Sequence, residues 1–150
     1  MSFITLTLIF LSNFVGQPTI WEDLFQDHFK PSCEKLEYWE DNFKEADLYP
    51  EMKAWITISQ AVCPWNPVSK YAFFNTGKDQ LEGLIKAEPN RFLARFLRLT
   101  VQEHAPVFLG YRDNIEPDRE FVMSNVAEFE NEPYYSFVVD YIQRHPKEVK

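Results

Sequence analysis

The stretch from Gly77 to Leu99, "GKDQLEGLIKAEPNRFLARFLRL", decides the fold class of this chain. Its apolar side chains recur every three or four residues, which is the spacing of one face of a helix. The triplet Glu88–Asn90 ends the first such pattern, and a second pattern begins almost at once at Phe92. We therefore expect two helices joined by a very short connection, an arrangement typical of an antiparallel helical hairpin.

The same helical pattern continues outward in both directions. Thr19 and Glu22 have the spacing of a capping box, and Asn66 followed by a proline has the form of a helix start. Val62 and Tyr71 fall on the apolar faces of the helices on either side of that start. In all, seven short amphipathic helices are predicted, beginning near Thr19, Ser32, Pro50, Asn66–Pro67, Phe92, Pro117 and Pro133.

The composition favours an all-α domain. Only 4 of the 150 residues are Gly whereas 10 are Pro, and the tight hairpins of all-β folds depend on Gly. The apolar share is 45% and the aromatic share is 17%, so we expect a core built largely from aromatic rings. Because no linker rich in Gly or Ser divides the chain, residues 17–150 are predicted to form one compact bundle of about seven short helices.

An apolar run, "FITLTLIFLSNFVG", precedes the first charged side chain, Glu22. Its length is typical of a signal peptide and too short for a comfortable bilayer span. We expect residues 1–16 to be a signal peptide, the mature chain to be periplasmic or secreted, and no transmembrane span to remain after cleavage. The lack of a basic residue before Ile4 and the bulk of Phe14 leave an alternative, in which the run is a buried element of a cytoplasmic chain.

Cys33 and Cys63 are the two cysteines of the chain. In an exported protein they could form a disulfide that closes a loop of about 30 residues. The spacing does not fix their separation in space, so two buried free thiols remain the alternative.

The middle of the chain resembles a tetratricopeptide-type helical hairpin. Gly77, Leu81 and Pro89 match the small residue, the large apolar residue and the terminating proline of its second helix, whereas Leu84 stands where a small residue is expected. More broadly, residues 66–122 are similar to a group of small exported bacterial helical proteins of uncharacterised function that share NP-x-SK, PN, RFLRL and FLGY elements. The resemblance implies a helical fold and an envelope location, and it implies no activity.

The segment "HAPVFLGYRDN", His104–Asn114, joins two of the expected helices. Its three apolar residues, Val107–Leu109, favour a loop that folds back and caps the core, with Gly110 permitting the turn. A ligand site is the alternative, because ordered loops often carry function. The candidate partner-binding residues at the exit of this loop are Tyr111, Arg112 and Asp113.

Arg91, Arg95 and Arg98 place a basic stripe along one face of the helix expected from Phe92. One interpretation is ion pairing with acids such as Glu88 or those of the second expected helix. The other is a groove for an acidic peptide or a carboxylate terminus, because Arg supplies planar forked donors. The three arginines are therefore further candidate partner-binding residues.

Charge and motifs narrow the possible functions. A net charge of −8 disfavours nucleic acid as a partner. The three histidines lack the spacing of a zinc motif, and the sequence contains no signature of nucleophilic, flavin or nucleotide chemistry, so no metal, cofactor or catalytic residue is predicted.

These observations lead to two expectations for function. The first is a non-enzymatic, exported helical module that binds an envelope protein or a peptide. The alternative is a small hydrolase-like enzyme, which requires acid, base and orienting groups of the loop to converge in a concave pocket. Those groups are His104, Tyr111, Asp113 and Glu116.

Overall fold

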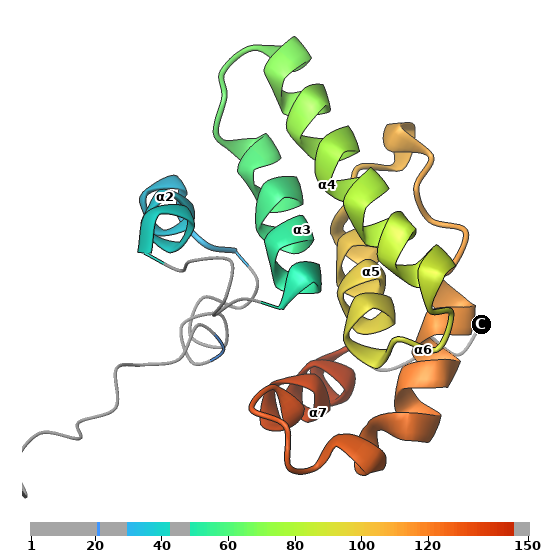
Figure 1. Cartoon of the computed structure of the whole chain (residues 1–150). Helices are drawn as coiled ribbons and strands as arrows, with labels where there is room; N and C mark the ends of the chain where they lie inside the picture. The colour runs from blue at the N-terminus through green and yellow to red at the C-terminus, as the bar shows by residue number, and fades with distance from the viewer. Residues whose placement is uncertain (1–20, 22–29, 43–48, 146–150) are drawn as a thin grey trace, which may run out of the picture.

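The structure, a computed structural model, describes residues 21, 30–42 and 49–145, and these ranges contain helices and no strand (Figure 1). The all-α prediction is thereby confirmed. Residues 1–16 and the helix expected from Thr19 lie outside the described residues, except for Trp21, which is helical and buried. The six α-helices of the described ranges are α2 (Cys33–Asn42), α3 (Pro50–Ser59), α4 (Pro67–Ala87), α5 (Phe92–His104), α6 (Ile115–Asn125) and α7 (Tyr135–Arg144). Three short 3₁₀ turns, η1 (Gln60–Val62), η2 (Val107–Leu109) and η3 (Val126–Phe129), lie between them.

The helix starts predicted from capping residues are confirmed in the first half of the described chain. Asn66 caps α4, because its side-chain oxygen accepts a hydrogen bond of 2.8 Å from the backbone N–H of Ser69. Ser32 acts in the same way for α2, accepting a bond of 3.2 Å from the N–H of Lys35. Pro50 occupies the first turn of α3, where a missing N–H leaves no helical bond unmade.

The starts of the last two helices differ from the prediction by two residues. Helix α6 begins at Ile115 rather than at Pro117, and α7 begins at Tyr135 rather than at Pro133. The reason is that none of the first four N–H groups of a helix has a partner inside it, so proline fits throughout the first turn and just before it. A proline therefore marks the neighbourhood of a helix start without fixing its first residue.

Helices α3 and α4 run side by side and pack along each other more extensively than any other pair (Figure 1). Gly77 permits this close approach, because a Cβ at this position would lie 2.6 Å from the carbonyl oxygen of Ala54 and 2.6 Å from Cγ1 of Ile58. The predicted short connection between α4 and α5 is present at residues 88–91, but the main partner of α4 is α3. Helix α5 contacts α3, α4 and α6, and α7 lies at the foot of the bundle in Figure 1.

The core is rich in aromatic rings, as the composition predicts. Phe96 of α5 is fully buried, and its ring lies edge-on to Phe137 and Tyr141 of α7 at centroid distances of 5.9 and 5.5 Å. Edge-to-face pairs of this kind add to the free energy gained by burying the rings. Val62 and Tyr71, which belong to the predicted apolar faces, are instead exposed, at 67% and 59%.

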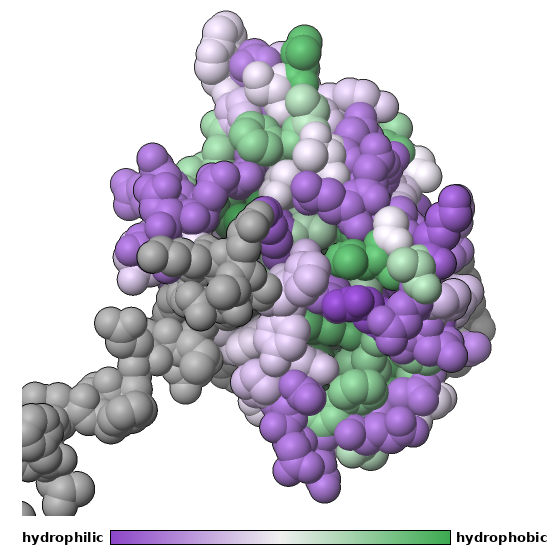
Figure 2. Space-filling view, in the orientation of Figure 1, coloured by the Kyte–Doolittle hydropathy of each residue, from purple (hydrophilic) through white to green (hydrophobic). Residues whose placement is uncertain are grey.

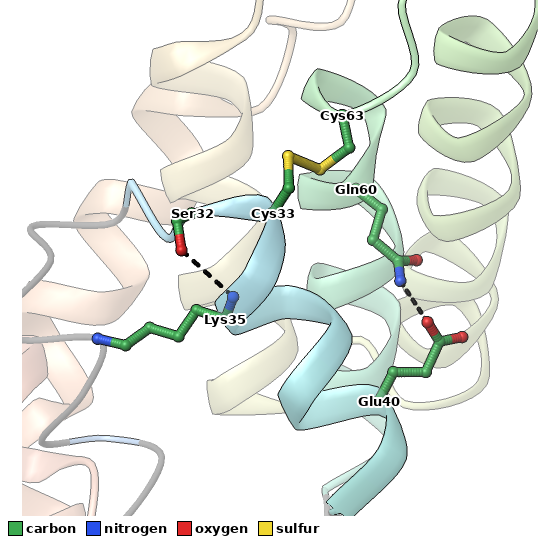
Figure 3. The surroundings of a disulfide bond; sticks show 6 residues. All are labelled: Ser32, Cys33, Lys35, Glu40, Gln60 and Cys63. Atoms are coloured by element: carbon green, nitrogen blue, oxygen red, sulfur yellow. Dashed lines mark hydrogen bonds between the residues drawn. A yellow bond between two sulfur atoms is a disulfide. The ribbon is translucent and has the colours of Figure 1, made fainter.

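A disulfide between Cys33 and Cys63 joins the first residue of α2 to the segment that follows η1 (Figure 3). The two Cα atoms are 5.7 Å apart, so of the two alternatives left open by the sequence, pairing is the one in the structure. Beside the disulfide, the side-chain amide of Gln60 donates a hydrogen bond of 2.6 Å to Glu40.

No helix in the described ranges has the length and apolar composition that crossing a membrane requires.

Candidate partner-binding groove

An open cavity of about 650 Å³ lies where the end of α3, the first turns of α4, the end of α5 and η2 meet. We call it the end groove. Its volume is within the range typical of ligand pockets in proteins. The residues that line it are Trp55, Ile58, Ser59, Ala61, Val62, Pro67, Lys70, Tyr71, Phe74, Thr100, Val101, His104, Ala105, Pro106, Phe108 and Leu109.

The floor of the end groove is rigid because its residues belong to the helical core. Trp55 of α3 is 3% exposed, and its indole N–H donates a hydrogen bond of 3.2 Å to the hydroxyl of Thr100. Phe74 of α4 and Val101 of α5 are also buried. Each of these side chains lies on the apolar face of its helix, which packs into the core. The cavity is therefore a part of the fold itself.

Two residues that line the end groove, Val62 and Phe108, are exposed, and Trp65, Val68 and Val107 are exposed near them in the sequence; we call these five apolar residues the apolar rim. They come from η1, the turn that follows it, the first turn of α4, and η2. The α3–α4 end of the bundle is at the top of Figure 2, where green surface lies among lilac and purple surface. Exposed apolar groups gathered around a cavity are typical of interaction sites. The exposed fractions are 67% for Val62, 92% for Trp65, 80% for Val68, 75% for Val107 and 86% for Phe108.

The prediction that Val107–Leu109 caps the core is wrong for its first two residues. Leu109 alone packs against the core, while Val107 and Phe108 project outward. The turn is closed by its own backbone bonds, from the N–H of Gly110 to the carbonyl of Val107 at 3.0 Å, and Gly110 adopts the expected left-handed conformation with φ at 61°. A short 3₁₀ turn satisfies these backbone groups without turning every apolar side chain inward.

Tyr111 fastens the exit of this loop to α4. Its hydroxyl donates a hydrogen bond to Glu82, and its ring lies edge-on to Phe74 at a centroid distance of 5.9 Å. Burial and the Glu82 carboxylate raise the pKa of Tyr111 well above its ordinary value, so its hydroxyl keeps its proton. Arg112, by contrast, is exposed and donates a bond of 3.5 Å to the carbonyl of Ala105 in the groove wall, and Asp113 is exposed beside it.

Arg91, the N-cap of α5, and Arg95 and Arg98 of α5, which together we call the arginine face, are paired inside the molecule. Arg98 is 7% exposed and donates bonds of 2.6 and 2.9 Å to the two carboxylate oxygens of Asp118, which is fully buried. Arg95 donates a bond of 2.8 Å to the same carboxylate, and Arg98 also contacts Glu82 at 3.0 Å. Charge-assisted forked bonds of this kind fix the geometry of both partners.

Arg91, the third member of the arginine face, pairs with Glu51 of α3 and more loosely with Glu88 at 3.4 Å. The ion-pairing interpretation of the stripe is therefore the one in the structure, including the predicted contact with Glu88. Its strongest partners, however, come from α3, α4 and α6, not from the second expected helix.

A further buried polar group escaped the sequence analysis. Arg119 of α6 pairs with Glu103 of α5, and the hydroxyl of Tyr141 of α7 donates to the same Glu103, so three helices meet there. The sequence does indicate this buried group. Asp118 and Arg119 precede the fully buried Val122 by four and three residues, which places them on the same side of the helix. Charged residues on the buried side of a helix need partners nearby.

The groups required by the hydrolase-like alternative do not come together at the end groove. Among His104, Tyr111, Asp113 and Glu116, only His104 lines it, and the hydroxyl of Tyr111 is engaged by Glu82. His104 itself lies with Nδ1 2.7 Å from the carbonyl oxygen of Thr100. Within the described part of the chain, no cluster of three or more potential ligands could hold a metal ion.

Comparison with known proteins gives no independent guide to function. No family model, no curated protein and no solved structure matches the chain.

Proposed function

We propose that this protein is a non-enzymatic binding module that takes up apolar side chains of a partner protein or peptide in the end groove. The observation that carries the proposal is a preformed apolar cavity surrounded by the exposed apolar rim. Binding energy at protein interfaces is concentrated in a few large side chains that enter such pockets. The apolar rim extends beyond the cavity, which favours a partner larger than a small molecule.

The groups around the end groove suggest how the earlier candidate residues contribute. Arg112 and Asp113 are exposed next to η2 and are free of the buried ion pairs, so they are placed to contact the polar edge of a partner. Arg91, Arg95 and Arg98 are held by internal carboxylates, and we assign them the supporting role of holding α5 against its neighbours.

Export to the cell envelope belongs to the same proposal. The Cys33–Cys63 disulfide supports it, because disulfides persist mainly in oxidising compartments. Mass spectrometry of the expressed chain tests it, with a mature product lacking residues 1–16 as the expected result. The tetratricopeptide-like interpretation is part of the same proposal, and Gly77 supports it as the small residue at which α4 comes close to a neighbouring helix.

The groove is tested with a random peptide library displayed on phage and panned against the disulfide-bonded chain. We expect the recovered peptides to carry large apolar side chains and to bind the Phe108→Ser variant at least about tenfold more weakly, because that substitution removes an apolar side chain at the groove mouth. The matched control is Met123→Ser, since Met123 is 54% exposed on α6 and does not line the groove. Equal binding by wild type and Phe108→Ser would contradict the proposal.

A further inference from the structure

The ionisable groups of the end groove are unlike those of the chain as a whole. The chain contains 23 acidic and 15 basic residues, yet no Asp or Glu is among the described residues that line the groove. Lys70 and His104 line it, and Tyr71 adds a phenol. The groove is thus a locally basic site in an acidic protein.

Lys70 and His104 approach the groove from two different helices. Lys70 lies in the first turn of α4, and His104 is the last residue of α5. Both side chains are exposed, and in the described part of the chain Lys70 has no ion-pair partner. His104 donates from Nδ1 to the carbonyl oxygen of Thr100 at 2.7 Å, so Lys70 is the groove-lining cation left to contact a partner.

From this arrangement, and resting on the proposed function, we infer that the partner segment carries a carboxylate next to its apolar side chains, received by Lys70. The apolar side chains fill the space between Trp55, Phe74 and Leu109, and the carboxylate lies at the mouth. A side-chain acid or the terminal carboxylate of a peptide supplies the same chemistry. Complementary charge at the edge of an apolar contact contributes to selectivity and register more than to affinity.

The inference predicts a preference opposite to the one set by total charge. A protein with a net charge of −8 attracts basic peptides over its whole surface. Peptides that depend on the groove should instead be enriched in acidic residues, so a basic background is readily told apart from binding at the groove. Added salt screens the background contacts more than the partly enclosed groove contact.

The test uses the peptides that the Phe108→Ser variant fails to bind. Replacing the acid of such a peptide by its amide is expected to weaken binding about threefold. Replacing Lys70 by Glu in the protein, which sets two carboxylates against each other, is expected to weaken it about tenfold. Pairing the Lys70→Glu variant with a peptide in which the acid is changed to Lys should restore binding. Lys86→Glu is the matched control, because Lys86 is exposed on the same helix, does not line the groove and changes the net charge equally.

Three results would overturn the inference. Suppose the recovered peptides need Phe108, contain no acid and bind the Lys70→Glu variant as tightly as wild type. The inferred carboxylate would then be wrong, and the proposed function would still hold. Dodecanoate bound through Lys70, with no peptide recovered, would identify a lipid-like carboxylate as the occupant. A dimer in sedimentation that Phe108→Ser abolishes would identify a second copy of this chain instead.

Discussion

The arginine face of α5 and the apolar rim both lie in surroundings opposite to those that their residue types suggest. Three arginines on one helix look like a surface for an acidic ligand, yet they are held by Glu51, Glu82 and Asp118 from three other helices. The apolar residues of η2 look like core, yet two of them are exposed. The difference shows that the neighbours a side chain meets decide its role, and those neighbours come from distant parts of the chain.

The sharpest test of this contrast compares two phenylalanines. Phe96 is fully buried whereas Phe108 is 86% exposed. We expect Phe96→Ala to lower the free energy of unfolding by about 4 kcal/mol, because it leaves a cavity among aromatic rings. Phe108→Ala should change it by less than about 0.5 kcal/mol. Urea denaturation followed by circular dichroism measures both, and similar losses in the two variants would place Phe108 in the core after all.

The second test removes the shared partner of the arginine face. Asp118→Ala leaves the nearly buried guanidinium of Arg98 with Glu82 alone, and we expect a loss of about 3–4 kcal/mol in unfolding free energy. Asp113→Ala is the control, since Asp113 is exposed in the nearby loop, and it should be almost silent. If the Asp118 variant were as stable as wild type, the arginine face would be available to a partner and the contrast would break down.

The third test removes the disulfide that joins α2 to the end of η1. Replacing Cys33 and Cys63 by Ser opens a loop with a sequence separation of 30, and the chain-entropy relation gives a loss of about 3.6 kcal/mol. Chemical denaturation of the variant against the oxidised wild type measures it. Helix α2 should stay docked through Leu36 and Trp39, which are buried, so the far-ultraviolet circular dichroism of the native variant should match that of wild type.

The smallest effect is expected at His145, the C-cap of α7, whose ring lies 5.6 Å from that of His104 in the end groove. Burial, and then the charges of His104 and Arg119, lower the pKa of His145 below its ordinary value of 6.5. The unfolded chain therefore binds the proton more readily, and stability decreases as the pH falls from 6.5 towards the lowered pKa. The other charged groups that act on His145 are Arg144, which lowers its pKa, and Asp140, which raises it.

This pH effect is measured as a difference between two proteins. Denaturation midpoints of wild type and His145→Gln are compared at about pH 7.5 and about pH 5.5. The variant should lose less stability than wild type over that interval, because it has no imidazole to protonate. A wild type that loses no more than the variant would contradict the lowered pKa.

Local chemistry explains which parts of the fold could be predicted. The Asn66 cap, the proline in the first turn of α3 and the buried face of α5 depend on residues a few positions apart, and all three are confirmed. The partners of the arginine face lie 40 residues away for Arg91 and 20 for Arg98. No periodic pattern in a single sequence specifies such pairs, so the contact of Arg91 with Glu88, three residues away, could be foreseen but the distant partners could not.

The end groove could not be predicted for a related reason. Its walls belong to three helices and a turn, and the sequence indicates which faces are apolar but not where the packing leaves a space. Tyr71 and Val62 lie on predicted apolar faces and are exposed because the helices part at that end of the bundle. The arrangement of helices, which depends on the whole core, decides that difference.

Gly77 determines how closely α3 and α4 approach each other, although it does not itself line the end groove. The missing side chain lets the backbone of α4 rest on Ala54 and Ile58 of α3, and Ile58 is itself part of the cavity wall. Even one methyl group at position 77 would push α3 and α4 apart, because packed interiors have little free space. A larger residue at position 77 is thus expected to widen the end groove without changing any residue that lines it.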